Sequence, residues 1–291
     1  MQGLVMREFP LRNWNIEGIT YGIFKISSFN EFLSQKKIPM KAKFIFLTLL
    51  PAIISFTTSA QTTIPVGASQ TYTTIETAYA SGIPSTITGA YIIELQSDYN
   101  PASEVYPITL AAKSGASAAN YIKITPAAGQ SFTITSIGAN HIFYLNGADW
   151  VNIDGIGKNL TISANNTGAY AAVYFDADAT NNTVQNCILQ GRSASATAGV
   201  VWFATGTSTG NDNNTISSCD ITDITSQPYN AIYCNATTSA TSADNISISS
   251  CSISNFWYAG GASNGILVAG YGSGGTTKTP RKPCKYRAFA F

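Results

Sequence analysis

Short apolar runs broken by polar residues recur along the middle of the chain at a nearly constant interval. Three of them share one pattern and carry a cysteine at the same position: Thr183–Leu189, Thr215–Ile221 and Ser247–Ile253. Successive cysteines are therefore 32 residues apart, at positions 187, 219 and 251. A degenerate copy begins at Val151. A fixed period of this length is typical of repeat proteins, in which each repeat is one structural unit.

A second family of short apolar strands alternates with the first. Its members are Phe143–Leu145, Val173–Phe175, Val201–Phe203, Ile232–Cys234 and Ile266–Val268. The segments between the two families are rich in Gly, Ser, Thr and Asn and vary in length, as loops do. Two strand families that both recur about every 31 residues indicate a chain that returns to its starting point after each coil.

This repetition predicts an all-β fold, a single-stranded parallel β-helix of about six coils over residues 61–277. Each strand then lies beside its copy in the next coil, about 4.8 Å away. A β-sandwich of alternating strands is the alternative, since it also has turn signals at short spacing. A sandwich gives no reason for equal intervals between equivalent cysteines, so we expect the solenoid.

The recurring cysteines Cys187, Cys219 and Cys251 should stack on one another in this fold. A disulfide or a metal site is one interpretation of such a ladder. The Cβ vectors of stacked residues run parallel, which is poor geometry for a disulfide, and no histidine accompanies the cysteines. We therefore expect buried free thiols that act as small apolar side chains, with Cys234 also in the core.

A family resemblance supports the same fold. The segments NNTVQNCILQG, NNTISSCDITDI and DNISISSCSISNF resemble coils of right-handed parallel β-helices of the pectin-lyase-like class. The segments Tyr72–Ala80 and Tyr91–Leu95 resemble the beginning of such proteins, a short capping helix, here expected over residues 72–81, and then the first strand. The resemblance covers about residues 61–270 and implies right-handed winding. It implies no single activity, because this fold carries lyases, hydrolases, adhesins and passive stalks alike.

The body also resembles large secreted proteins of Bacteroidetes-type bacteria. Those proteins carry a β-helix ahead of further modules and a C-terminal sorting domain for type IX secretion. The resemblance implies a bacterial protein that is secreted or held at the cell surface.

Residues 40–60 have the pattern of a secretory signal peptide. Lys41 and Lys43 precede an apolar run over 44–56, and small residues follow it, so we expect cleavage before Gln61. A buried or membrane-spanning helix is the alternative, but the run is short for a bilayer and Pro51 interrupts it. Residues 1–39 show neither strand alternation nor a helical stripe. We expect them to be a non-native upstream extension, with translation starting at Met40 and no membrane span after signal removal.

The far end of the chain departs from the repeat. Residues 278–291 hold five basic groups, no acidic group, and the prolines Pro280 and Pro283, which do not suit a central parallel strand. A basic functional tail is one interpretation. We expect instead a truncated or frame-shifted coding sequence, with further C-terminal modules missing.

Charge is distributed unevenly along a chain whose formal net charge is +1. Residues 61–277 hold four cations and twelve carboxylates, which gives 4 − 12 = −8. An acidic body of this kind repels phosphate backbones, so we expect no nucleic-acid partner. His141 is the single histidine, which argues against His-centred triads and multi-His metal sites, and we expect no metal site.

Alternation within the second strand family assigns its residues to two faces. Val173 and Phe175 share one parity and should point inward, whereas the residues between such pairs should point outward. The outward aromatic residues are Tyr144, Tyr174, Trp202 and Tyr233, with Leu267 at the same position in the last repeat. Flat apolar rings with polar tips suit stacking on sugars, so these four are our candidate ligand-binding residues. A loop folded over them, or β-propensity on a solvated sheet, would also explain them.

Catalytic candidates near these aromatic residues are few. Asp176 and Asp178, at i and i+2, could supply the two carboxylates of a glycoside hydrolase. A lyase of the pectate-lyase type would need carboxylates that hold Ca²⁺ and a basic residue, for which Arg192 is the one arginine of the body. Acidic residues that keep a neutral sheet soluble are the alternative. We expect no cofactor unless the protein is a lyase, which would take Ca²⁺.

Together these observations predict an adhesion module, secreted or at the cell surface, that binds extracellular polysaccharide through the outward aromatic residues. The alternative is a polysaccharide lyase or glycoside hydrolase of the pectin-lyase-like class. A passive stalk is a third possibility.

Overall fold

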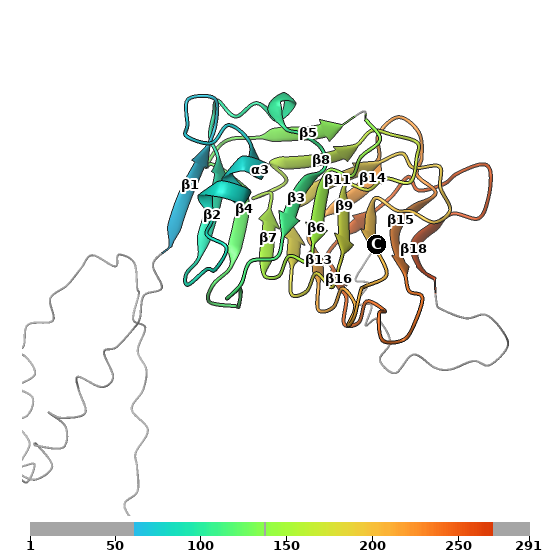
Figure 1. The fold of residues 1–291 in the computed structure, drawn as a ribbon. Coiled ribbons are helices and arrows are strands. Elements are labelled where there is room, and N and C mark those ends of the chain that lie inside the picture. Colours follow the sequence, from blue (N-terminus) through green and yellow to red (C-terminus); the bar gives the residue numbers. More distant parts are fainter. Residues whose placement is uncertain (1–60, 137, 270–291) are drawn as a thin grey trace, which may run out of the picture. The chain divides into compact units, whose positions relative to one another are not determined.

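A computed structural model describes residues 61–136 and 138–269 and shows a parallel β-solenoid of about seven turns (Figure 1). Every pair of neighbouring strands within its three sheets is parallel. The predicted β-helix is therefore confirmed, while right-handed winding stays a prediction. The predictions for residues 1–39, 40–60 and 278–291 concern segments outside the described residues.

Each of the later coils crosses the three sheets in the same order. The seven-stranded sheet contains β1 (Thr62–Val66), β2 (Tyr91–Leu95), β4 (Ile122–Pro126), β7 (Val151–Asp154), β10 (Thr183–Gln185), β13 (Thr215–Ser217) and β16 (Ser247–Ser249). The five-stranded sheet contains β5 (Phe132–Ser136), β8 (Leu160–Ala164), β11 (Cys187–Gly191), β14 (Asp220–Asp223) and β17 (Ser252–Ile253). The six-stranded sheet contains β3 (Ile108–Ala111), β6 (Phe143–Asn146), β9 (Val173–Asp176), β12 (Val201–Phe203), β15 (Asn230–Asn235) and β18 (Asn264–Ala269).

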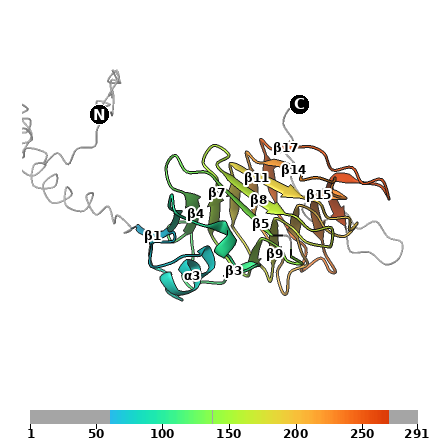
Figure 2. The same ribbon diagram turned by 90° about the horizontal axis from the view of Figure 1, so that it is seen from above.

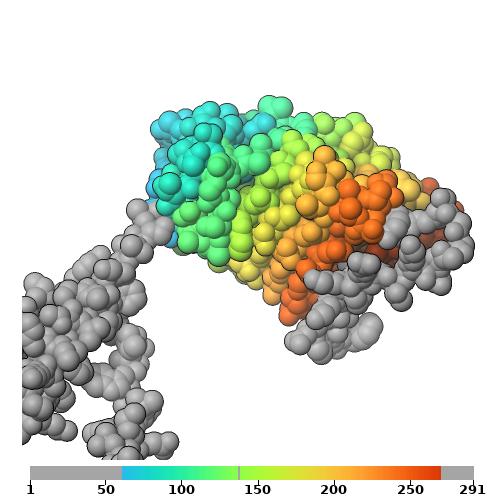
Figure 3. Space-filling model, turned by 60° about the horizontal axis from the view of Figure 1, so that its bottom comes forward, coloured from blue at the N-terminus to red at the C-terminus, as the bar shows by residue number. Residues whose placement is uncertain are grey.

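The stacking of coils is visible in three views. Figure 1 shows strands of successive coils side by side, and Figure 2 shows β5, β8, β11 and β14 following one another along another face. In the space-filling view, colour bands cross the described surface in sequence order, because each coil contacts the next (Figure 3). None of the helices in the described residues is long and apolar enough to cross a membrane.

The cysteine-bearing segments are each two strands rather than one. β10 ends at Gln185 and β11 begins at Cys187, and Asn186 between them has a φ of 54°. Ser218 and Ser250 occupy the equivalent positions with φ of 51° and 53°. This left-handed conformation bends the chain from the seven-stranded into the five-stranded sheet. Prediction of one continuous strand per segment was therefore wrong, and the solenoid has three sheets where the sequence suggested two strand families.

The core is built from inward ladders that repeat at the same register. Ile153, Val184, Ile216 and Ile248 form one of them, and all four are buried. The register also places the three recurring cysteines at one position of successive coils. Cys187 and Cys219 are buried, Cys251 is partly buried, and all are free thiols. The prediction of unpaired thiols in the core is thus confirmed, and so is the burial of Cys234.

A cap covers the end of the core near β2, as predicted, but its α-helical part is brief. Helix α3 (Ile75–Thr77) continues into a π-helical turn over Ala78–Gly82. The buried Glu104 carboxylate accepts hydrogen bonds from the Ile75 backbone N–H at 2.6 Å and from the Tyr99 hydroxyl at 2.7 Å. β1, which the sequence did not single out, precedes the helix and pairs with β2.

Buried asparagine side chains tie successive coils together before the seven-stranded sheet. The Asn214 side-chain oxygen accepts hydrogen bonds from the backbone and the side-chain amide of Asn182, at 2.9 and 3.0 Å. The Asn214 amide donates to the carbonyl oxygens of Ala179 and Asn211, at 2.8 and 2.9 Å. These contacts satisfy backbone groups that a buried loop would otherwise leave unpaired.

Candidate functional site

The outward aromatic residues of the six-stranded sheet form one continuous row. Tyr144, Tyr174, Trp202 and Tyr233 are register partners in β6, β9, β12 and β15, and we call them the aromatic row. Centroids of successive rings are 5.4, 4.9 and 5.9 Å apart, and the rings are tilted or edge-to-face. Parallel stacking thus brings residues about 30 positions apart in the sequence into direct contact.

The members of the aromatic row differ in exposure. Tyr144, Tyr174 and Trp202 are partly buried, whereas Tyr233 is only 5% exposed. Tyr233 can therefore offer little contact area to a ligand. The row is bounded by Thr109 on β3 and Leu267 on β18, which occupy the same register position. The structure narrows the accessible part of the row to three rings.

His141 belongs to this cluster, although the sequence had pointed to it only as a lone histidine. Its ring stacks on Tyr174 with centroids 4.0 Å apart and an interplanar angle of 4°. Its centroid is also 5.6 Å from that of Tyr170 and 5.8 Å from that of Trp202. His141 and Tyr170 lie in the loops just before β6 and β9. Each is an aromatic residue a few positions before a strand of the aromatic row, and this is the sequence signal that could have identified His141 and Tyr170.

His141 is neutral at pH 7. Burial lowers its pKa to about 4, and the nearby Asp176 acts in the opposite direction without restoring the ordinary value. Nδ1 accepts a hydrogen bond from the Ala171 backbone N–H at 3.0 Å, so the neutral ring carries its proton on Nε2. The cluster thus contains an uncharged hydrogen-bond donor, the Nε2–H of His141, beside the rings of Tyr170, Tyr174 and Trp202.

The polar tips of the row are held by neighbouring side chains. The Tyr144 hydroxyl donates to Oδ2 of Asp176 at 3.0 Å, and Nε1 of Trp202 donates to Oδ1 of Asn235 at 2.8 Å. The Asn235 amide in turn donates to the Thr205 hydroxyl at 3.0 Å. Because both ends of these contacts are protein groups, the rings are oriented before any ligand binds.

Asp178 has a structural role that the sequence did not reveal. Its Oδ1 accepts hydrogen bonds from the backbone N–H groups of Thr207 at 2.8 Å and Gly210 at 2.9 Å, and the N–H groups between them also donate to its carboxylate. Burial acts to raise the pKa of Asp178, but these hydrogen bonds outweigh it and hold the pKa below its usual value. A carboxylate with a lowered pKa is a poor general acid.

The three catalytic candidates do not form one cluster. Asp176 lies at the end of β9, where it binds Tyr144 and accepts the Ala177 backbone N–H at 2.8 Å. Arg192 directly follows β11 of the five-stranded sheet and donates to Asn165, which follows β8 of that sheet, at 3.2 Å. The contacts therefore join Asp176 to the aromatic row, whereas Arg192 contacts a residue that follows the five-stranded sheet.

Two ion pairs among the described residues join different coils. Lys123 pairs with Asp154 at 2.8 Å, and Lys158 pairs with Asp220 at 2.7 Å. Within residues 61–136 and 138–269, no group of three or more His, Cys, Asp or Glu side chains is arranged to hold a metal ion.

Comparison of the chain with protein-family models, curated proteins and solved structures finds no match.

Proposed function

We propose that the protein is a bacterial adhesion module, secreted or at the cell surface, that binds extracellular polysaccharide through the aromatic row and His141. The observation that carries the proposal is the in-register row of partly exposed rings, fixed by internal contacts. Sugars present apolar ring faces and hydroxyl groups, and they match a surface that combines aromatic rings with hydrogen-bonding groups. A row that crosses several coils suits an extended chain better than a single sugar.

The electrostatics of the body favour an uncharged polysaccharide. Residues 61–277 carry four cations against twelve carboxylates, and the two ion pairs among the described residues engage Lys123 and Lys158. A polyuronate would be repelled by this net negative charge. His141, whose pKa burial lowers to about 4, adds no positive charge at neutral pH.

The alternative, a polysaccharide lyase or glycoside hydrolase, has no specific observation in its favour. Asp178 holds a loop through backbone hydrogen bonds, and Arg192 donates to Asn165. Export, the signal peptide at 40–60 and further C-terminal modules follow from the sequence alone and form part of the proposal on that basis.

Binding to immobilised polysaccharides tests the proposal. We expect a neutral polysaccharide to retain the protein, and Trp202→Ala to weaken this binding about tenfold, because it removes the largest ring of the accessible row. Trp257→Ala is the matched control, since Trp257 is 63% exposed and lies outside the row. Equal binding by the two variants, or no retention by any polysaccharide, would contradict the proposal. Release of unsaturated sugars with Ca²⁺, or of new reducing ends, would favour the enzyme.

A further inference from the structure

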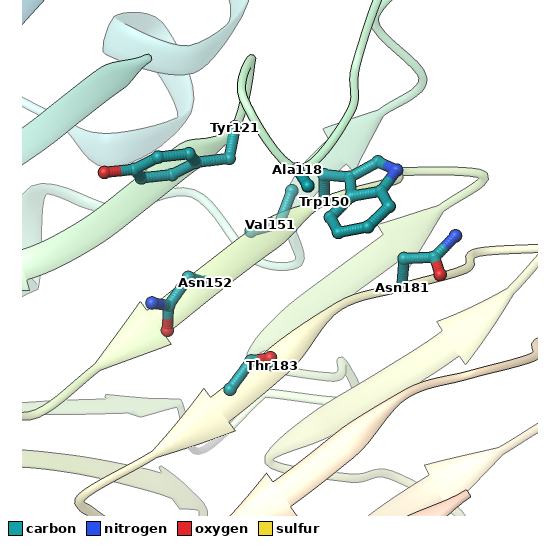
Figure 4. A pocket seen from close by; sticks show the side chains of 7 residues that line it. All are labelled: Ala118, Tyr121, Trp150, Val151, Asn152, Asn181 and Thr183. Carbon is teal, nitrogen blue, oxygen red and sulfur yellow. The ribbon is translucent and has the colours of Figure 1, made fainter. Parts of the chain in front are cut away.

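A separate hollow lies on the outer face of the seven-stranded sheet (Figure 4). Its volume is about 230 Å³, and Tyr121, Trp150, Asn152, Asn181 and Thr183 contribute to its lining. Tyr121 and Trp150 stand on either side of Val151, and the side chains of Asn152 and Thr183 lie below them in the view. We call it the Trp150 hollow. It uses none of the residues of the aromatic row.

The backbone at Trp150 is unusual for its residue type. Trp150 has a φ of 57°, and the register of β7, β10, β13 and β16 places it at the coil position that Asn181, Asn213 and Asn245 occupy in later coils. Those three have φ of 59°, 57° and 56°. Asparagine adopts this left-handed conformation readily, whereas a bulky side chain does so rarely.

The four coils of β7, β10, β13 and β16 therefore share a left-handed residue at this position, but only the coil of β7 uses tryptophan for it. The three later coils have asparagine at this position, which suits the left-handed conformation. The coil of β7 instead places the indole of Trp150 there, at the edge of the hollow. Residues held in sparsely populated backbone conformations concentrate at binding sites, where the surrounding structure fixes them. This contrast between equivalent coils points to a role for Trp150 at the surface.

Asn152 supplies a second, independent observation. Its side-chain oxygen is buried and has no hydrogen-bond partner. Such acceptors are rare in folded proteins because they lose their water without gaining another partner. Asn152 also lines the Trp150 hollow, so a turn of its amide would bring this oxygen to a ligand hydroxyl there and remove the deficit.

The lining also indicates the chemical class of the ligand. No charged side chain lines the hollow, and Lys123, the register neighbour of Asn152, is paired with Asp154 at 2.8 Å. Aromatic walls, side-chain amides and a hydroxyl suit an uncharged polyhydroxyl compound with an apolar ring face. Sites for drug-sized ligands measure roughly 300–1,000 Å³, so a hollow of about 230 Å³ suits one ring.

We propose that the Trp150 hollow binds a single uncharged sugar residue, with the aromatic side chains against its ring and the Asn152 oxygen accepting from a hydroxyl. This site stands on residues of a different sheet, so it does not depend on polysaccharide binding by the aromatic row. The two could act on separate chains or on branches of one glycan.

Ligand-observed NMR with methyl glycosides of glucose, galactose, mannose and N-acetylglucosamine tests this proposal on the full chain carrying Trp202→Ala. That background weakens the aromatic row and leaves the Trp150 hollow intact. We expect saturation transfer to at least one glycoside, with a millimolar dissociation constant. Trp150→Asn should weaken this binding at least tenfold while the protein stays folded, because asparagine is the residue of the later coils at this position.

Asn152→Ala is the second variant and keeps the proposal testable if Trp150→Asn fails to fold. It removes an acceptor that has no partner, so we expect an unchanged thermal midpoint and about fivefold weaker glycoside binding. Methyl glucuronide should bind more weakly than its neutral counterpart. The proposal is overturned if none of the four glycosides binds, if both variants bind like the parent, or if the charged sugar binds as tightly as the neutral one.

Discussion

His141 is the residue whose environment makes the candidate surface sensitive to pH. Its ring is stacked on Tyr174 and its Nδ1 is occupied by a backbone N–H. Burial lowers its pKa from 6.5 to about 4, which means that the fold favours the neutral ring. The resulting stabilisation is complete above pH 6.5 and is lost as the pH falls toward 4.

We therefore expect His141→Gln to change the pH dependence of stability. Between pH 7.5 and pH 4.5 the wild-type protein should lose on the order of 1–2 kcal/mol of unfolding free energy more than the variant, after allowance for partial exposure of the ring. Denaturant unfolding at both pH values measures this difference. Buried Glu104, whose pKa burial raises, titrates in both proteins and cancels. Parallel pH profiles would show that His141 is not held neutral.

At the residue scale, the alternation of side chains along a strand predicted whether most of them point inward or outward, but not how exposed they are. Tyr174 and Phe175 lie on opposite faces as parity requires, and Phe175 stacks on Phe203 inside the core at 4.5 Å. Tyr233 faces outward yet is 5% exposed, and Val268, predicted to be inward, is 47% exposed on the last described strand. Exposure depends on what lies over a side chain, and strand periodicity carries no information about that.

At the scale of elements, the missed third sheet has a visible cause. The inward residues Val184 and Cys187 are three positions apart, whereas neighbouring inward residues of one strand are two apart. The extra residue is the left-handed bend at Asn186. Three copies of this spacing were present in the sequence, so the corner was predictable from the change of parity. The early strand β1 was harder to predict, because Pro65 lies inside it and only an edge strand accepts one.

The asparagine contacts between coils should account for a large share of local stability. Asn214 is fully buried and makes four hydrogen bonds to backbone and side-chain groups of Asn182, Ala179 and Asn211. Asn214→Ala removes these four hydrogen bonds, although the Asn182 amide keeps its bond to the Ala148 carbonyl, so we expect a loss of about 3 kcal/mol and a thermal midpoint lower by roughly 6–12 °C. Circular dichroism during heating measures this change.

The neighbouring Asn213 provides the control for that substitution. It is exposed and has a φ of 57°, which glycine also accepts. Asn213→Gly should therefore shift the midpoint by no more than about 2 °C. If both variants unfold at the same temperature, the Asn214 hydrogen bonds do not stabilise the coil.

At the scale of the whole molecule, strands of each coil pair only with strands of the coils before and after it, and a few side chains, such as Lys158 and His141, reach two coils along. The stability of such an array is approximately the sum of the stabilities of the single repeats and of the contacts between neighbouring repeats. Local opening can therefore start at one end without unfolding the rest. In the described part of the chain, the coil of β16, β17 and β18 packs against one described coil, that of β13, β14 and β15. Cys251 and Val268 of this coil are also more exposed than Cys219 and Cys234 at the same positions of the preceding coil, so we expect opening to begin there.

The stacked thiols report directly on that order of opening. Cys251 is partly buried in the terminal described coil, whereas Cys219 and Cys187 are fully buried one and two coils further in. Under native conditions we expect a maleimide to label Cys251 at least about tenfold faster than Cys219, and Cys187 most slowly, as measured by mass spectrometry of the separate peptides. A Cys284→Ser variant is the control. It should show the same order of labelling if the label has been assigned to the correct cysteines. Labelling of Cys187 as fast as Cys251 would contradict opening from this end and would mean that one event exposes all the stacked coils, including those that form the two proposed sugar sites.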